Sequence, residues 1–251
     1  MHTRAAYAVC QMQRILVLNP KGGSGKTTIA TNLASYFASQ GDRPLLQDQD
    51  PQGSSTRWWK KRKPEQAFIH AVATFERNTR MTRTFQMRVP PEAQHVIIDT
   101  PAAVLSQDMP ELTKNADAII VPVLPSDIDI AAFSKCISDL LLIAKVRRDE
   151  QRIGVVANRV KRNTLIFQSL MRFLDTLRIP VIATLRDSQN YVRAAEMGVG
   201  LHEMKKVEQD LEDWAPMLAW LKAKESARLG LEGVSAQPDA GVNPQPETAL
   251  S

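Results

Sequence analysis

Residues 15–29 of this 251-residue chain read Ile-Leu-Val-Leu-Asn-Pro-Lys-Gly-Gly-Ser-Gly-Lys-Thr-Thr-Ile, and this stretch decides the fold. The apolar run 15–18 predicts a buried strand, and the amphipathic run 29–37 predicts a helix. A glycine-rich turn between the two presents several backbone N–H groups to a phosphate chain at the positive end of the helix. Lys26 can reach the β- and γ-phosphates, and the Thr27 hydroxyl can ligate Mg²⁺. The stretch therefore predicts a nucleotide-binding protein.

Strand-like and helix-like segments alternate along most of the chain. The expected strands are 15–18, 44–49, 67–73, 95–99, 118–123, 153–157 and 180–184. The expected helices are 26–40, 54–61, 75–88, 128–145, 165–176, 191–197 and 207–228. Several strands are apolar on both faces, as buried parallel strands are. The alternation predicts an α/β fold, a doubly wound and mainly parallel sheet with helices on both faces and ligands at the carboxyl ends of the strands.

The composition predicts one globular domain over residues 1–229. From residue 230 onward Gly, Ala, Pro, Gln and Ser dominate, which predicts a disordered acidic tail over 230–251. No apolar stretch reaches the length of about 20 residues that spans a bilayer. The two cysteines, Cys10 and Cys136, form no CxxC pair, which argues against a disulfide framework, a structural zinc site or an iron–sulfur cluster. The expected compartment is the cytosol.

The chain is basic, with a formal net charge of +5. The charge is uneven, because residues 229–251 contain three acidic side chains and no Lys or Arg. The remainder of the chain therefore carries a larger positive excess. Such an excess favours a polyanionic partner without requiring one.

Three carboxylates follow expected strands. Asp48 and Asp50, at i and i+2, lie on the same side of an extended chain at its carboxyl end, where they could act beside the phosphates. The alternative is a turn with capping aspartates. Asp99 ends the apolar run 96–98, and a single Asp in this position can hold Mg²⁺ through water.

The phosphate loop departs from the general G-x-x-x-x-G-K-[ST] pattern. Pro20 stands where that pattern begins with Gly, and an extra lysine, Lys21, precedes Gly22-Gly23. The form K-G-G-x-G-K-T-T resembles the deviant phosphate loop of the ParA/MinD family of ATPases. The resemblance implies bound ATP and Mg²⁺, and a homodimer in the ATP state in which Lys21 reaches the partner's phosphates. The alternative for Lys21 is a solvated loop lysine.

The same resemblance implies roles for individual residues. The catalytic residues would be Lys21, Lys26 and Asp50, with Asp50 orienting the attacking water. The Mg²⁺ site would be formed by Thr27, Asp48 and Asp99. The nucleotide would be bound by Gly22, Gly23, Ser24, Gly25, Lys26, Thr27, Thr28, Asn158 and Arg159. Asn158 would read the adenine edge, because an amide offers a donor and an acceptor together; the alternative is a turn residue after a strand.

Residues 180–206 resemble the region with which ParA proteins bind non-specific double-stranded DNA. The matching basic residues are Arg186, Arg193, Lys205 and Lys206. Lys and Arg contacts to phosphates need no base reading and give salt-sensitive binding. The alternative is a solvated basic helix face. No basic amphipathic helix stands at the carboxyl end of the sequence, so a membrane partner is not expected.

The resemblance, which covers residues 14–225, implies an ATPase that coats the nucleoid as an ATP-bound dimer. A cargo-linked adaptor protein would stimulate hydrolysis and so position or segregate a plasmid, a chromosome region or a protein body such as a carboxysome. One alternative is a MinD-like, membrane-associated regulator of the division site. Another is a metabolic ligase or an iron–sulfur reductase, and the two cysteines do not suit the latter. The sequence does not identify the cargo.

Overall fold

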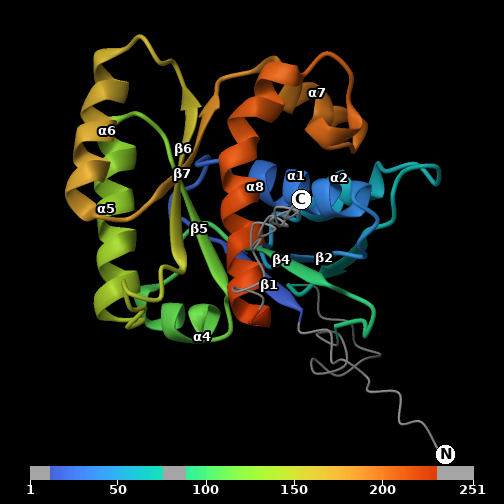
Figure 1. Ribbon diagram of the computed structural model, residues 1–251, viewed down its shortest axis with the longest axis horizontal. Helices are drawn as coiled ribbons and strands as arrows, with labels where there is room; N and C mark the ends of the chain where they lie inside the picture. The colour runs from blue at the N-terminus through green and yellow to red at the C-terminus, as the bar shows by residue number, and fades with distance from the viewer. Residues whose placement is uncertain (1–11, 76–88, 231–251) are drawn as a thin grey trace, which may run out of the picture.

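The computed structural model describes residues 12–75 and 89–230. Within these ranges a sheet of seven parallel strands lies between two layers of helices (Figure 1). The strands are β1 (Gln13–Val17), β2 (Leu45–Asp48), β3 (His70–Ala73), β4 (His95–Asp99), β5 (Ala118–Val123), β6 (Ile153–Val160) and β7 (Val181–Arg186). Their order across the sheet is β3-β2-β4-β1-β5-β6-β7. The predicted doubly wound α/β fold is confirmed.

The helices form one layer on each face of the sheet (Figure 1). One layer contains α1 (Lys26–Ser39), α2 (Ser54–Lys60), α7 (Gln189–Met197) and α8 (Glu208–Leu229). The other contains α4 (Met109–Thr113), α5 (Asp127–Leu142) and α6 (Leu165–Leu177). Two 3₁₀ turns, η1 (Ser106–Asp108) and η2 (Leu201–Glu203), connect elements. No helix in the described ranges is long and apolar enough to cross a membrane.

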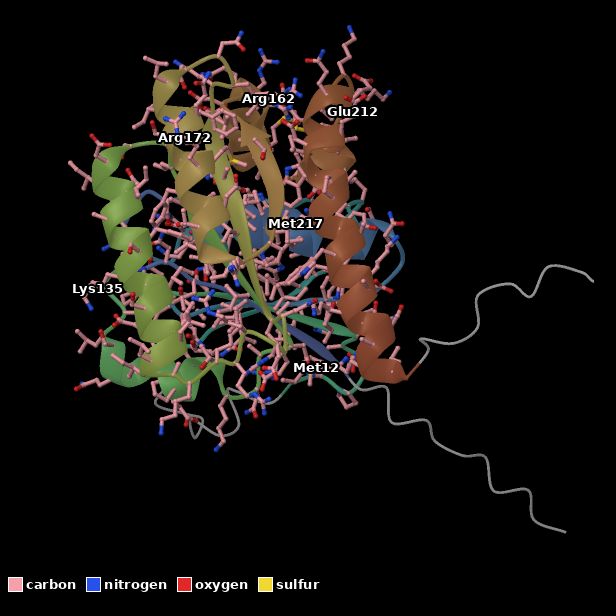
Figure 2. The ribbon with its side chains drawn as sticks, turned by 60° about the vertical axis from the view of Figure 1, so that its left-hand side comes forward. Met12, Lys135, Arg162, Arg172, Glu212 and Met217 are labelled. Carbon is pink, nitrogen blue, oxygen red and sulfur yellow. The ribbon has the colours of Figure 1, made fainter. Side chains whose placement is uncertain are left out.

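Side-chain alternation along β1 divides the core between these layers. Ile15 and Val17 are buried under α1 and α8, whereas Leu16 is buried in the cluster under α4, α5 and α6. On the first face Trp214 and Met217 of α8 are fully buried, and Met217 points inward in Figure 2. Each such side chain stabilises the fold by roughly 1.5–3 kcal/mol. The central strand β1 is thus packed on both faces, and this packing fixes the position of the phosphate loop that follows it.

The strand register brings the predicted site together. Val17 of β1 and Asp48 of β2 both pair with Asp99 of β4. The carboxyl ends of these three strands therefore meet at one edge of the sheet, where ligands of doubly wound folds bind. The phosphate loop after β1 lies between the segments that follow β2 and β4.

Some boundaries differ from the expectation. β6 continues to Val160, past the expected end at residue 157, because Val160 still pairs with Arg186 of β7. β3 begins at His70, where pairing with β2 starts, so it is shorter than 67–73. The helix α4 was not predicted. Of the expected helix 75–88, all but the first residue lies outside the described ranges, and so does the expected tail beyond residue 230.

Candidate nucleotide-binding site

The phosphate loop connects β1 to α1 with two glycines in the left-handed region. Gly23 has φ +78° and Gly25 has φ +98°, which side chains other than glycine rarely allow. Gly25 is the N-cap of α1 and provides no side-chain cap. The first N–H groups of α1 therefore remain available to an anion. This geometry places the predicted loop residues where a phosphate chain can bind.

Asn158 connects the phosphate loop to β6 through a hydrogen bond. It is buried, its Nδ2 donates to the Ser24 carbonyl at 2.9 Å, and its Oδ1 accepts from the Arg159 N–H at 2.9 Å. A Cβ at Gly25 would lie 2.0 Å from Asn158 Nδ2. Asn158 thus supports the loop in addition to the base contact expected for it, for which one N–H and one lone pair of Oδ1 remain.

We expect Gly25→Ala to abolish nucleotide binding and to destabilise the fold by about 2–4 kcal/mol, since it adds a clash with Asn158 to an unfavourable φ. Gly41→Ala is the matched control. Gly41 has φ +93° and nothing within 4 Å of its added Cβ, so it isolates the backbone strain. Denaturant unfolding and nucleotide titration of both variants measure the difference. Equal effects in the two variants would contradict the clash.

Asp99 has surroundings that suit a hard cation. It is fully buried, and its Oδ2 accepts hydrogen bonds from Thr27 Oγ1 at 2.8 Å and from Ser55 Oγ. Its Oδ1 is buried and has no hydrogen-bond partner among the described residues. Burial raises the Asp99 pKa to about 6, and the hydrogen bonds from Ser55 and Thr27 oppose this shift. Carboxylate and hydroxyl oxygens are the ligands that Mg²⁺ prefers, so Thr27 and Asp99 fit the ion.

Asp48 and Asp50 differ in their surroundings. Asp48 is buried, and its Oδ2 accepts hydrogen bonds from the N–H of Thr56 at 2.9 Å and from its hydroxyl at 2.7 Å, so it holds the first turn of α2. The half-buried carboxylate of Asp50 accepts a single hydrogen bond within the described ranges, from the Gln52 N–H at 2.9 Å. Asp48 thus fixes the segment that presents Asp50 to the site. Its expected contact with the water shell of Mg²⁺ remains a prediction.

The two lysines of the phosphate loop have different partners. Lys26 is buried, and its Nζ donates to the Lys21 carbonyl at 3.2 Å. Burial lowers the Lys26 pKa, and the nearby carboxylates of Asp99 and Asp50 oppose this shift. The Nζ of Lys21 instead lies 2.6 Å from Asp129 Oδ2. Lys26 therefore faces the site of its own chain, whereas Lys21 is held at the amino end of α5.

Ser55 and Asp129 were missed by sequence reasoning. Asp129 lies three residues after Ser126, the N-cap of α5, whose side chain accepts from the Asp129 N–H. This spacing marks a helix start in the sequence and carries no signal of a lysine partner. Ser55 lies in the first turn of α2, and only the folded structure shows that it contacts Asp99 at the end of β4.

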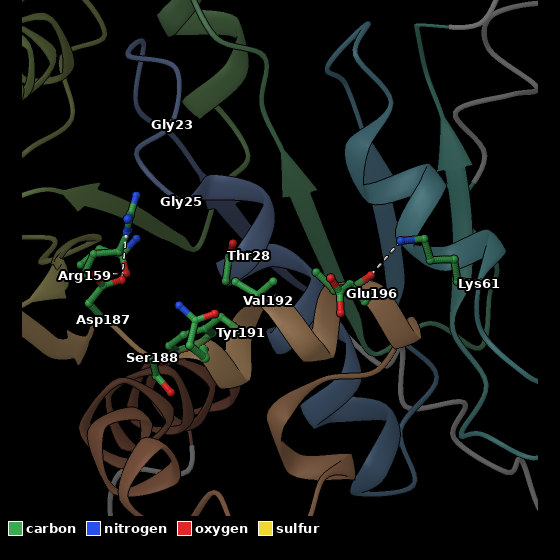
Figure 3. Close-up of a pocket in the computed structure, with 13 residues that line it drawn as sticks. Gly23, Gly25, Thr28, Lys61, Arg159, Asp187, Ser188, Tyr191, Val192 and Glu196 are labelled. Atoms are coloured by element: carbon green, nitrogen blue, oxygen red, sulfur yellow. Dashed lines mark hydrogen bonds and ion pairs between the residues drawn. The ribbon is translucent and has the colours of Figure 1, made fainter.

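A pocket of about 540 Å³ lies beside the loop, between the end of β6 and α7 (Figure 3). Tyr191 and Val192 of α7 form part of one wall, and Gly25 and Thr28 form part of the other. At its edge Arg159 Nε lies 3.2 Å from Asp187 Oδ1. The volume is in the range of small-molecule sites, and the pocket continues from the phosphate loop. The pocket is large enough for the base and ribose of a nucleotide.

The four basic residues predicted to bind DNA fall into two groups. Arg193, Lys205 and Lys206 are exposed. Arg186 instead lies against Asp213, with its Nε 2.8 Å from Asp213 Oδ2 and its Nη1 donating to Gln209 at 2.7 Å. The hydrogen bond with Asp213 raises the Arg186 pKa. Arg186 thus ties β7 to α8, and its contact with DNA remains a prediction.

Comparison with known proteins gives the same picture as the geometry. The family model of the CobQ/CobB/MinD/ParA nucleotide-binding domain matches residues 15–201. Maintenance of carboxysome distribution protein A of Halothiobacillus neapolitanus is 26% identical over 193 residues, which are 76% of this chain and 87% of that protein. The protein of the same name from Gloeobacter kilaueensis is 35% identical over 128 residues, 51% of this chain and 56% of its own length.

Among solved structures, apo McdA of Cyanothece superposes with a TM-score of 0.62 at 17% identity. The match covers 85% of this chain and 99% of that one. At this identity the likeness shows a common fold. It agrees with the doubly wound fold of the seven-stranded parallel sheet.

Proposed function

Because the chain belongs to the CobQ/CobB/MinD/ParA nucleotide-binding family, we propose that it is a ParA-type ATPase that positions or segregates an intracellular cargo. In this proposal it binds ATP and Mg²⁺, closes into a homodimer around the nucleotides, and binds non-specific double-stranded DNA of the nucleoid. A cargo-linked adaptor protein stimulates hydrolysis and thereby releases the DNA. The protein acts in the cytoplasm. Two relatives are named for the maintenance of carboxysome distribution, which supports a cargo of this kind.

The observation that carries the proposal is the separation of the two loop lysines. Lys26 lies inside the site of its own chain, whereas Lys21 extends to Asp129 at the rim. A lysine at the rim can cross to a second copy that faces the same edge of the sheet. Among the deviant-loop ATPases that the sequence resembles, this is the expected use of the extra lysine.

The surface around Lys21 suits a second copy of the chain. A pocket of about 410 Å³ beside Lys21 is lined in part by Leu105 and Ile128. Leu105 is 57% exposed and Ile128 is 75% exposed. Large apolar side chains gathered on an exposed surface mark interaction sites. A dimer closed over the nucleotide edge would bury both of them.

In the ATP complex the residues of the site would share the chemistry. The Mg²⁺ ion would neutralise developing charge on the phosphates, held by Thr27 and by Asp99, whose Oδ1 is unpartnered among the described residues. Lys26 would bind the phosphates from its own chain. Asp50 would orient the attacking water, which suits its half-buried carboxylate.

We expect Asp50→Ala to lower ATP hydrolysis by roughly 10²–10⁴-fold and to leave ATP affinity nearly unchanged, because it removes the group that orients the water. The variant should accumulate as an ATP-bound dimer. Phosphate release and size-exclusion chromatography with ATP measure the two effects. Gln52→Ala is a control in the same segment, since Gln52 gives Asp50 only a backbone N–H. An unchanged hydrolysis rate in Asp50→Ala would remove Asp50 from the mechanism.

The test of the whole proposal is binding to non-specific duplex DNA with ATP and with ADP, with anionic liposomes in parallel. We expect binding to DNA in ATP only. Lys205→Ala/Lys206→Ala should reduce the slope of log affinity against log salt by about 2, one for each lost phosphate contact. The control is Lys114→Ala/Lys145→Ala, which removes two exposed lysines; Lys145 shares with Lys206 a positive φ, +54° against +60°. Liposome binding without DNA binding would favour the membrane-associated alternative.

A further inference from the structure

A further pocket lies at the amino-terminal edge of the sheet, where β6 and β7 begin. It has a volume of about 250 Å³, and its basic residues are Arg147, Arg148, Arg152 and Arg178. β6 has eight residues, so about 25 Å of strand separates this pocket from the nucleotide edge. It is therefore a separate feature, which the proposed ATPase site does not use. We refer to it as the arginine pocket.

Two of the four arginines have no counter-ion among the residues that the structure describes. Arg147 pairs with Asp149, and Arg152 pairs with Glu150 at 2.6 Å. Arg148 donates to the Leu177 carbonyl, which is neutral. The guanidinium of Arg178 has no hydrogen bond or ion pair with any residue in the described ranges. Two uncompensated guanidinium groups in one pocket fit a carboxylate, which guanidinium can bind in a bidentate manner.

The backbone at this pocket is held in an unusual conformation. Gln151 has φ +49° and Arg178 has φ +53°, and both line the pocket. Arg178 ends α6 at a position where glycine is the usual residue. Non-glycine residues in this region are strained and cluster at functional sites such as ligand clamps. A glycine here would relieve the strain but would remove the guanidinium.

One wall of the pocket is apolar. It is formed by Trp220 of α8 together with Ile179 and Pro180. The Trp220 ring also carries the Lys224 amine 5.8 Å from its centroid. A ligand that fits both sides must carry a carboxylate beside an apolar group. Proline next to an acidic residue meets this requirement, because proline-rich segments bind to aromatic surfaces in an extended form.

We propose that the arginine pocket binds the chain's own acidic segment, residues 231–251. This segment contains three acidic residues, no Lys and no Arg. In Pro238-Asp239 and Pro246-Glu247 a proline directly precedes a carboxylate. The carboxylate lies between Arg148 and Arg178, and the proline lies against Trp220. The negative charge of this segment complements the positive charge of the pocket. Each acidic residue offers a carboxylate to Arg148 and Arg178.

The chain length permits this contact. Trp220 precedes Gly230 by ten residues, which is about 15 Å along the helix axis. Nine residues lead from Gly230 to Asp239 and can span up to about 30 Å. Glu232 is only two residues from Gly230, a reach of about 7 Å, and is therefore too near the helix end. Asp239 and Glu247 are the two residues that can return to the pocket.

Duplex DNA is the other polyanion that could bind the arginine pocket. Its phosphates lie on a convex backbone and offer no apolar group to Trp220, whereas the arginine pocket is concave and has an apolar wall. The observations therefore favour the peptide. This proposal does not depend on ATP hydrolysis, so it can fail or succeed independently of the proposed function.

The test uses the full chain with Cys10→Ser and Ala240→Cys, labelled with bimane, which tryptophan quenches on contact. Cys136 is fully buried and stays unlabelled. We expect Trp220→Phe and Arg148→Gln/Arg178→Gln each to raise the fluorescence at least about twofold, because a short tether gives a millimolar effective concentration and keeps the segment bound. Asp239→Asn/Glu247→Gln should give the same rise.

The charge-matched control is Lys161→Ala/Arg172→Ala, which removes two exposed cations outside the pocket and should leave the fluorescence unchanged. Quenching that persists in Arg148→Gln/Arg178→Gln would overturn the proposal. Quenching that grows with protein concentration would show binding between copies and would overturn the intramolecular contact. Unchanged fluorescence with weakened binding of duplex DNA in Arg148→Gln/Arg178→Gln would assign the pocket to DNA instead.

Discussion

Replacing Asp99 by Asn is expected to stabilise the nucleotide-free protein at pH 8 and, at the same time, to lower Mg²⁺-dependent ATP hydrolysis by roughly 10²–10³-fold. The two effects have one cause. The Asp99 carboxylate is fully buried beside Thr27 and Ser55, so without a bound cation its negative charge destabilises the fold. Asparagine has the same shape, and its amide oxygen can accept the same hydrogen bonds.

The pH dependence identifies the cause. Burial raises the Asp99 pKa from 3.8 to about 6, so between these values the folded protein binds more protons than the unfolded chain. The free energy of unfolding therefore falls as pH rises through this window. The gain from Asp99→Asn should be near zero below pH 4 and should reach about 2–3 kcal/mol above pH 7.

Denaturant unfolding from pH 4 to pH 8, without nucleotide or Mg²⁺, measures this gain. Asp175→Asn is the control, because Asp175 is an exposed carboxylate on α6 and its loss should give no comparable rise. If the gain in stability from Asp99→Asn did not depend on pH, the charge of Asp99 would not be what destabilises the nucleotide-free protein. Adding Mg²⁺ and nucleotide should stabilise the natural protein more than the variant.

Sequence reasoning predicted the phosphate loop and the strand ends because both depend on local chemistry. The glycines of the loop and the apolar run before Asp99 are visible within a few residues. The strand that ends in Asp99 was placed correctly at 95–99, since a buried parallel strand shows as a continuous apolar run. The confirmed fold follows from the same alternation of short apolar and amphipathic segments.

What the sequence did not predict depends on contacts between distant segments. The contact between Arg186 and Asp213 was not predicted, because the two residues are 27 positions apart and meet only through the packing of α8 against β7. Asp129 lies more than 100 positions from Lys21 and meets it only because β5 is adjacent to β1. The extra length of β6 likewise results from pairing with β7 rather than from its own residues.

Replacing Lys21 by Ala is expected to lower ATP hydrolysis by roughly 10²-fold while ATP affinity changes little, because Lys26 alone serves the site of its own chain. The structure explains why the hydrolysis rate and the ATP affinity should respond differently. The Lys21 amine pairs with Asp129 at the rim of the site, where it can reach the nucleotide of a second copy. Phosphate release and equilibrium ATP binding measure the two effects. Lys114→Ala, at an exposed site on the opposite edge, is the control.

A mixture of inactive variants tests whether Lys21 acts across the dimer. Lys21→Ala retains Asp50, and Asp50→Ala retains Lys21, so a heterodimer contains one complete site if Lys21 acts on the partner's nucleotide. Random pairing makes about half of the dimers mixed, each with one complete site of two, so a 1:1 mixture should recover about one quarter of the natural rate. If Lys21 acts within its own chain, each mixed dimer has two incomplete sites and the mixture stays inactive. Recovery therefore requires both a dimer and a lysine that crosses it, which binding data alone cannot establish.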